Sequence, residues 1–158
     1  MVNTANANKL AFEALKSNSI EKLAGYSEVI PEKKIYDSRF DFFLKGHPTK
    51  ADCWVEVKNV TLLESGTHAT FPDSVSDRGR KHLLDLIRLK REGVRAAMLY
   101  IVSRTDALSF GPAGHIDKAY AQTFHEAVQA GVEIHCHQVD FSDSSWKIGS
   151  PLPVVCEK

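Results

Sequence analysis

The sequence predicts one domain of the mixed α/β class, in which a central sheet is flanked by helices. The chain has 158 residues, 43% of them hydrophobic, which is enough for one well-buried core and too little for two ordinary domains. Segments with helical and strand periodicity alternate along the chain. The apolar run from Ala96 to Val102 has the pattern of a strand covered on both faces, so helices are expected on both sides of the sheet.

The first predicted helix is capped by Asn3 or Thr4 and ends near Lys16. Its apolar positions follow helical spacing and are Ala7, Leu10, Ala11 and Ala14 or Leu15. A short helical turn over residues 19–25 and a strand over residues 28–36 are expected next. The chain therefore enters the sheet after one helix.

Two β-like runs, residues 38–44 and 53–58, form a predicted hairpin across the polar residues 45–52. Successive side chains of a strand point to opposite faces. The expected faces of the first run are Phe40, Phe42 and Leu44 on one side, and Arg39, Asp41 and Phe43 on the other. Those of the second run are Cys53, Val55 and Val57 on one side, and Trp54, Glu56 and Lys58 on the other.

Pairing Leu44 with Cys53 in this hairpin places Asp41 opposite Glu56. Opposed strand residues have Cβ atoms about 5 Å apart, close enough for two carboxylates to bind one hard cation. Mg²⁺ would remove their repulsion and lower the pKa of a water that can attack a phosphodiester. Lys58, on the same face, can orient that water or stabilise the phosphorane charge. The alternative interpretation is an exposed strand face with a weak Glu–Lys ion pair.

After the hairpin, the second strand can continue through residues 60–63, and residues 64–73 are a predicted loop. A helix over residues 74–92 follows and ends at Gly93. Its expected buried positions are Val75, Gly79, Leu83, Leu86 and Leu89. Beyond the strand at residues 95–102, a loop is expected over residues 103–116.

Asp117 is the predicted cap of a third helix that ends at Gly131. The expected buried stripe of this helix is Tyr120, Phe124, Ala127 and Val128. A last core strand is expected from Val132, where apolar and polar residues alternate. The domain is therefore assigned to residues 1–140, and residues 141–158 to a C-terminal tail without regular structure.

Composition argues against several classes of protein. Lys and Arg number 20, as do Asp and Glu, so the formal net charge is +0 and any nucleic-acid contact must come from a local patch. No run approaches the roughly 20 apolar residues that span a bilayer, and the N-terminus lacks the order of a signal peptide. Cys53, Cys136 and Cys156 have no CxxC spacing and predict reduced thiols in a cytoplasmic protein.

Three ordered motifs resemble the sugar fermentation stimulation protein A family. They are the D…ExK hairpin, the segment 71–83 (FPDSVSDRGRKHL) and the segment 110–117 (FGPAGHID). The resemblance covers nearly the whole chain and implies the family's C-terminal domain, which is similar to PD-(D/E)XK restriction-endonuclease-like proteins. The family's usual N-terminal OB-like domain, thought to bind DNA, is missing, so the chain is a natural short form or an excised fragment.

The resemblance also implies roles for individual residues. Asp41 and Glu56 would be the metal-binding acids, Val57 would offer a backbone carbonyl, and Lys58 would be the catalytic lysine. Glu13 would be a first-helix acid that reaches the metal through water, although a helix-surface glutamate is ordinarily just solvated. The implied cofactor is Mg²⁺ or Mn²⁺ and the implied partner is DNA, with a homodimer as one arrangement that cuts both strands.

Positive charge concentrates on the predicted second helix, at Arg78, Arg80, Lys81, His82, Arg88, Lys90 and Arg91. Arg78, Lys81 and His82 lie within about one turn of each other and can clamp phosphates beside the metal. A basic run on a helix is usually a solvated face. The family motif favours phosphate contact for Arg78 and Lys81.

Three further patterns have simpler explanations than a site. His135 and His137 share a strand face, but no nearby Cys or acidic pair completes a zinc site, so edge polarity is the preferred interpretation. Asp117 is expected to cap a helix rather than to form an acid–base pair with His115. Trp54, beside a strand core, is expected to pack rather than to stack on a base.

The leading hypothesis is a metal-dependent, endonuclease-like hydrolase of DNA. The alternative is a non-catalytic DNA-binding regulatory module linked to sugar (maltose) utilisation genes. Intact Asp41, Glu56 and Lys58 favour the enzyme, because a scaffold has no need to place two carboxylates together. A sugar-binding protein is prompted only by the family name, and no aromatic platform with sugar-site spacing supports it.

Overall fold

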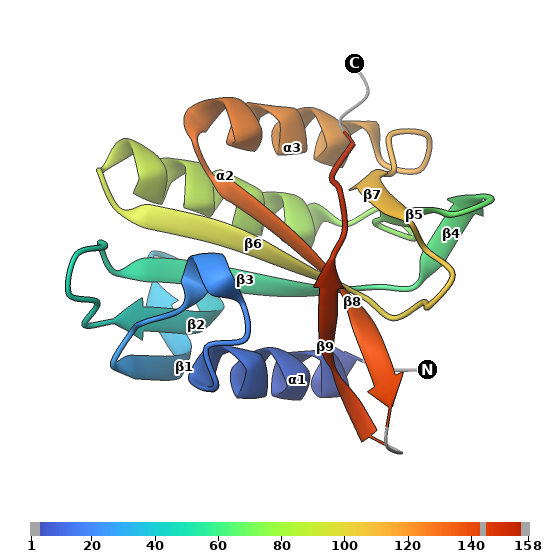
Figure 1. The fold of residues 1–158 in the computed structure, drawn as a ribbon. Coiled ribbons are helices and arrows are strands. Elements are labelled where there is room, and N and C mark those ends of the chain that lie inside the picture. Colours follow the sequence, from blue (N-terminus) through green and yellow to red (C-terminus); the bar gives the residue numbers. More distant parts are fainter. Residues whose placement is uncertain (1–3, 143–144, 156–158) are drawn as a thin grey trace.

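A computed structural model describes residues 4–142 and 145–155, which form two sheets and three α-helices (Figure 1). The helices are α1 (Thr4–Lys16), α2 (Asp77–Arg91) and α3 (Lys118–Ala130), and a 3₁₀ turn, η1, covers Glu21–Leu23. The strands are β1 (Glu28–Ile35), β2 (Ser38–Lys45), β3 (Cys53–Val60), β4 (Leu62–Ser65), β5 (His68–Phe71), β6 (Arg95–Val102), β7 (Ser109–Pro112), β8 (Glu133–Ser142) and β9 (Ser145–Pro151). The predicted mixed α/β class is confirmed.

The main sheet has the strand order β1-β2-β3-β6-β8-β9. Its three central strands, β3, β6 and β8, are parallel, and the outer strands pair antiparallel. Helices α2 and α3 cover one face of this sheet and α1 covers the other (Figure 1). The prediction that the strand at residues 95–102 is covered on both faces is confirmed, because seven of its eight residues are buried.

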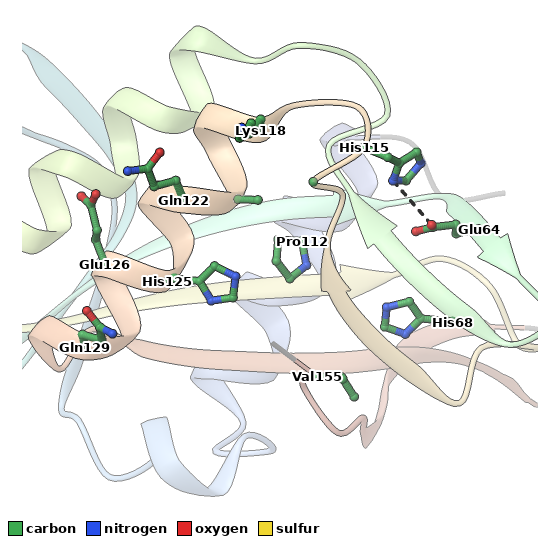
Figure 2. A pocket seen from close by; sticks show the side chains of 12 residues that line it. Glu64, His68, Pro112, His115, Lys118, Gln122, His125, Glu126, Gln129 and Val155 are labelled. Carbon is green, nitrogen blue, oxygen red and sulfur yellow. Dashed lines mark ion pairs between the residues drawn. The ribbon is translucent and has the colours of Figure 1, made fainter. Parts of the chain in front are cut away.

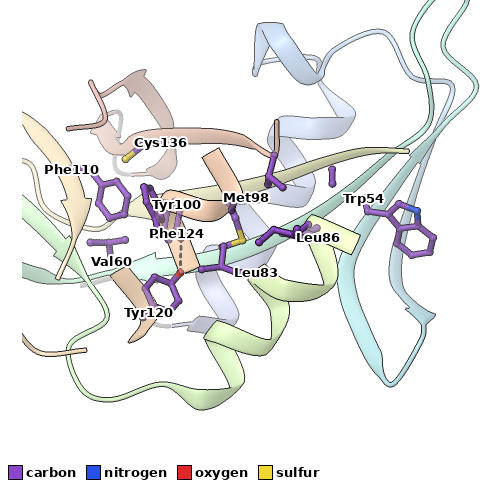
Figure 3. Close-up of a cluster of buried hydrophobic side chains, with 14 of the residues drawn as sticks. Trp54, Val60, Leu83, Leu86, Met98, Tyr100, Phe110, Tyr120, Phe124 and Cys136 are labelled. Carbon is purple, nitrogen blue, oxygen red and sulfur yellow. Dashed lines mark hydrogen bonds between the residues drawn. The ribbon is translucent and has the colours of Figure 1, made fainter. Parts of the chain in front are cut away.

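Alternate residues of β6 belong to two hydrophobic cores. Met98 and Tyr100 lie in the core under α2 and α3, where the Tyr100 and Tyr120 hydroxyls are 2.5 Å apart (Figure 3). Leu99 and Ile101 lie in the core under α1. The predicted stripe of α1 is buried in this second core, at Ala7, Leu10, Ala11, Ala14 and Leu15.

A second, three-stranded sheet with the order β4-β5-β7 corrects two predictions. Residues 64–73 and 103–116 were expected to be loops, yet both contain strand residues, and β3 ends at Val60 instead of continuing. The short strands carry polar residues, glycine or proline, so local periodicity gives no signal. They form because β5 and β7, far apart in the sequence, pair with each other in parallel.

The expectation that residues 141–158 contain no regular element is also wrong. β8 runs on to Ser142, and β9 pairs antiparallel with it, with Val139 opposite Ile148. β9 is a short edge strand that includes Gly149 and Pro151, which are depleted in strands, so its sequence gives only a weak strand signal. Gly149 allows the close pairing, because a Cβ there would lie 2.9 Å from the Gln138 carbonyl oxygen.

Two predicted core positions are corrected as well. Val75 is 68% exposed, because α2 begins only after Ser76, whose side chain accepts a hydrogen bond from the Gly79 N–H. Val128 is 42% exposed, and Thr123 is buried in its place. The Thr123 hydroxyl accepts a hydrogen bond from Arg80 Nε at 3.0 Å, so a polar residue fills the contact between α2 and α3.

Other local predictions are confirmed. The Asp117 side chain caps α3 by accepting from the Tyr120 N–H, and Gly131 ends this helix with a φ of 96°. None of the helices in the described ranges is long and apolar enough to cross a bilayer. Cys53 and Cys136 are buried free thiols. Asn3 and Cys156, for which a cap and a thiol were predicted, lie outside the described residues.

Candidate metal centre

The register of the hairpin is the predicted one, with Leu44 paired to Cys53 and Phe42 paired to Val55. The backbone pairing of β2 with β3 covers Phe42 to Leu44 and does not include the preceding residue, Asp41. At Asp41 the side chain replaces the backbone as hydrogen-bond acceptor, because its Oδ2 accepts a hydrogen bond from the Val57 N–H at 2.8 Å. Its Oδ1 accepts a hydrogen bond from Asn8 Nδ2 of α1 at 2.9 Å.

The predicted assignment of β2 side chains to the two faces of the sheet is wrong where this pairing ends. Phe40 was expected to share a face with Phe42, but it packs under α2 against Trp54, with ring centroids 6.0 Å apart. Phe42 packs under α1 against Phe12. Regular alternation fails here because the strand is no longer held by β3, and the facing β1 residue Glu32 has a φ of 52°.

Glu56 lies in the middle of β3 and is only 3% exposed. Its Oε2 is 2.7 Å from His82 Nδ1 of α2 and 3.0 Å from Lys58 Nζ. Its Oε1 is buried and has no hydrogen-bond partner in the described part of the chain. One oxygen of this carboxylate is therefore held from two sides and the other is free to bind.

The Asp41 and Glu56 carboxyl groups lie close enough for each to shift the pKa of the other. Burial, followed by the charge of Glu56, raises the pKa of Asp41 to about 7. Burial also opposes ionisation of Glu56, but the hydrogen bond from His82 and the charge of Lys58 outweigh it, so the pKa of Glu56 is lowered. Without a cation, Asp41 therefore keeps its proton up to near-neutral pH, which relieves the repulsion between the two carboxylates.

These donors fit a hard divalent cation. A buried oxygen without a partner is costly unless something binds it, and here it lies beside a second carboxyl group. The N–H and C=O of one strand residue point to the same side, so the Val57 carbonyl also faces the Asp41 side. Carboxylate and carbonyl oxygens are the ligands that Mg²⁺, Mn²⁺ and Ca²⁺ prefer.

Glu13, the predicted first-helix acid, is not brought to these carboxylates. It is exposed and lines a different hollow with Lys9 and Trp146. Asn8, the α1 residue that does reach Asp41, lies five residues earlier, which on a helix is a rotation of about 140°. Its amide was missed because an Asn beside apolar helix positions carries no pattern of its own.

A basic cleft of about 530 Å³ opens beside the centre, between α2 and the start of β2. Its lining residues are Lys34, Tyr36, Asp37, Ser38, Arg39, Arg78, Lys81 and His82. Lys81 Nζ is fixed by the Asp37 carbonyl at 3.1 Å and by Ser38 Oγ at 3.2 Å. The sequence prediction placed Arg78 and Lys81 together correctly but missed Lys34 and Arg39, which come from the β1–β2 hairpin.

The remaining basic residues of α2 have other positions. Arg80 bonds Thr123 of α3, and the Arg88 guanidinium stacks on the Tyr36 ring at 3.7 Å. His82 lies at the wall of the basic cleft but is only 4% exposed, with its ring directed at Glu56. The lysines and arginines that line the cleft are therefore two from the helix and two from the hairpin, rather than the whole basic run.

The other predicted polar positions lie elsewhere. Trp54 packs against Phe43, with ring centroids 4.5 Å apart. His135 contacts Glu133 at 3.0 Å, and His137 contacts the Gly149 carbonyl at 3.0 Å. Among the described residues, no three His, Cys, Asp or Glu side chains gather as one metal-binding group.

A separate hollow lies between α3 and the second sheet (Figure 2). His68, His115 and His125 line it, and His115 pairs with Glu64 at 3.5 Å. None of the residues that line this hollow belongs to the carboxylate centre or to the basic cleft. Asp117, two residues after His115, accepts hydrogen bonds from the Tyr120 and Ser76 N–H groups and is therefore a helix cap.

Comparison with known proteins gives consistent matches. Residues 5–145 match the family described as the sugar fermentation stimulation protein RE domain. The chain is 47% identical over 149 residues to a sugar fermentation stimulation protein homolog of Jannaschia sp. (strain CCS1), a match that covers 93% of this chain and 61% of the relative. It is 45% identical over 155 residues to the homolog of Marinomonas sp. (strain MWYL1), covering 98% of this chain and 60% of the relative.

Among solved structures, the fold is similar to that of Pyrococcus furiosus SfsA in complex with Ca²⁺. The TM-score is 0.86 and the sequence identity 29%, and the match covers 96% of this chain and 65% of that one. The chain thus spans 60% to 61% of the length of the curated relatives above.

Proposed function

The chain belongs to the sugar fermentation stimulation protein family, and we propose that it is a metal-dependent, nuclease-like protein that hydrolyses DNA phosphodiesters. The mixed six-stranded sheet and the match to the family's RE domain support the predicted PD-(D/E)XK restriction-endonuclease-like class. The observation that carries the proposal is the buried contact of Asp41 with Glu56, whose Oε1 has no partner in the described ranges, beside Lys58. A purely structural pair of strands gains nothing from such a contact.

The proposed cofactor is Mg²⁺ or Mn²⁺, held by Asp41, by Glu56 Oε1 and by the Val57 carbonyl. The related Pyrococcus furiosus SfsA was solved with Ca²⁺, which supports a divalent site in this family. When bound, such a cation supplies positive charge next to the phosphodiester and acidifies a water for attack. Glu13, exposed on α1, stays a prediction and would need a bridging water.

Lys58 has the position of a residue that handles the reacting groups. Its ammonium lies 3.0 Å from Glu56 Oε2 and 3.1 Å from His82 Nδ1, and its side chain is 15% exposed. It is therefore anchored at its tip yet reachable by a substrate. In the proposed reaction Lys58 orients the attacking water and stabilises the negative charge that develops on the phosphate oxygens.

The basic cleft is the proposed path of the DNA backbone. Lys34, Arg39, Arg78 and Lys81 gather there although the formal net charge of the chain is +0, so the attraction is local. Because His82 connects the cleft to Glu56, a phosphate bound beside Arg78 or Lys81 would lie close to the centre. We also propose a cytoplasmic location, which the buried free thiols Cys53 and Cys136 support, and a homodimer for double-strand cleavage.

The alternative is a non-catalytic DNA-binding module linked to sugar-utilisation genes. The basic cleft supports it, because backbone contact requires no metal. A supercoiled plasmid in Mg²⁺, Mn²⁺ or EDTA separates the two. The enzyme predicts nicking or linearisation only with metal, whereas the module predicts salt-dependent DNA retention in all three solutions and no cleavage.

A further inference from the structure

Among the basic residues of α2, His82 is the one whose side chain points into the protein and contacts Glu56. Its side chain is 6% exposed, and its ring packs against that of Phe40, with centroids 5.9 Å apart. Its Nδ1 lies 2.7 Å from Glu56 Oε2. A buried imidazole held in this way offers little surface to a phosphate of the DNA backbone, the partner that its sequence position predicted.

Glu56 is held asymmetrically as a result. Oε2 is contacted by His82 Nδ1 and by Lys58 Nζ, whereas Oε1 has no hydrogen-bond partner among the residues described. The two contacts come from different elements, α2 and β3. Only the contact from α2 is independent of the strand that carries Glu56, so it fixes the carboxylate relative to the rest of the fold.

We propose that His82 is a positioning residue, which holds Glu56 Oε2 so that the carboxylate presents Oε1 alone to the metal. The inference rests on the proposed function, in which Glu56 is a metal ligand. Residues that orient a metal ligand from behind typically change metal affinity by about 10- to 100-fold when they are removed. His82 thus belongs to the metal centre rather than to the DNA-binding cleft.

The geometry also has a consequence for metal choice. A carboxylate with one oxygen occupied binds a cation through a single oxygen, which suits the octahedral sites of Mg²⁺ and Mn²⁺. Ca²⁺ is larger and readily takes both oxygens of one carboxylate. Loss of the His82 contact leaves Oε2 held by Lys58 Nζ alone, on the same strand as Glu56, so the carboxylate can turn and affinity for Mn²⁺ should fall more than affinity for Ca²⁺.

Calorimetric titration of the full chain with MnCl₂ and with CaCl₂, without DNA, tests this. His82→Ala should weaken Mn²⁺ binding by about 10- to 100-fold and shift the Ca²⁺/Mn²⁺ affinity ratio toward Ca²⁺. His82→Asn places an amide N–H where Nδ1 lies and should restore most of the affinity. His82→Gln places its amide at the Nε2 position and should not. Arg91→Ala, at an exposed basic position of the same helix outside the cleft, should bind both metals like the wild type.

The outcomes separate this inference from the proposed function. Folded His82→Ala that binds Mn²⁺ like the wild type, or His82→Gln that restores binding as well as His82→Asn, overturns the positioning role and leaves the metal centre intact. If circular dichroism shows that His82→Ala is unfolded, the Mn²⁺ affinities of His82→Asn and His82→Gln are compared instead, and only the higher affinity of His82→Asn supports the positioning role. A wild type that binds neither metal, or Glu56→Gln that binds as the wild type does, overturns the proposed centre and this inference with it.

Discussion

The Asp41 and Glu56 carboxyl groups are neighbours, although the backbone pairing of their two strands stops one residue short of Asp41. Asp41 lies where β2 separates from β3, and it replaces the missing strand contact with a bond from the Val57 N–H. The end of the pairing therefore creates the space in which two carboxylates face each other. Only a proton or a cation makes this contact favourable.

Asp41→Asn should stabilise the metal-free protein above neutral pH. Because burial and Glu56 raise the pKa of Asp41 from 3.8 to about 7, its contribution to stability is complete below pH 4 and is lost as the pH rises through 7. The neutral amide removes this loss, so the free energy of unfolding should rise by up to about 4 kcal/mol at pH 8. Urea unfolding in EDTA measures it. An equal gain at pH 5, where Asp41 already carries its proton, would contradict the assignment.

Metal binding should become weaker as the pH falls below 7. A cation at the pair must displace the proton that Asp41 holds in the metal-free protein, so binding releases nearly one proton at pH 6 and fewer at pH 8. The apparent Mn²⁺ affinity should therefore fall up to about tenfold between pH 7 and pH 6. Calorimetry in buffers of different ionisation enthalpy counts the protons. Constant affinity and no proton release over this range would exclude Asp41 as a ligand.

Arg78→Ala and Lys81→Ala should weaken DNA binding and reduce its dependence on salt. Both residues line the basic cleft, and each lost phosphate contact lowers the slope of log K against log salt by about 1. Arg91→Ala is the matched control, because Arg91 is a basic residue of α2 that does not line the cleft. Fluorescence anisotropy with a labelled duplex in EDTA measures the slopes. If Arg91→Ala changes the slope as much, binding follows overall charge rather than the cleft.

Asp117→Ala should destabilise the fold without involving the metal centre. The buried Asp117 carboxylate accepts the Tyr120 N–H, which caps α3, and the Ser76 N–H just before α2, both at 2.9 Å. Loss of both bonds should cost about 2–3 kcal/mol in the free energy of unfolding. Asp140→Ala, at an exposed position, should change it by less than about 0.5 kcal/mol. Denaturation by urea compares the two, and equal effects would contradict the double cap.

Much of the fold could be predicted from local patterns. The helix caps and glycine stops placed α3 to within a residue, and the apolar run of β6 revealed a sheet covered on both sides. The register that brings Asp41 near Glu56 followed from alternation in two short strands. These features depend on residues close in the sequence, where periodicity carries the information.

The features that were missed depend on distant contacts. β9 and the second sheet exist because remote segments pair, and their own residues give little strand signal. Asn8 and His82 reach the carboxylates from helices 33 residues before Asp41 and 26 residues after Glu56, so no spacing rule connects them. Lys34 and Arg39 join the basic cleft for the same reason. The nature of the centre could be predicted from strand patterns, but its supporting contacts required the structure.

The most direct test of the central claim is cleavage of labelled duplex and single-stranded DNA by the wild type and by Glu56→Gln, in Mn²⁺ and in EDTA. Glu56→Gln keeps the shape of the buried side chain and leaves the basic cleft unchanged, so DNA binding in EDTA should equal that of the wild type. We predict that cleavage requires Mn²⁺ and falls at least about 100-fold in the variant. Cleavage that persists in EDTA, or an equal rate for Glu56→Gln, would contradict the account.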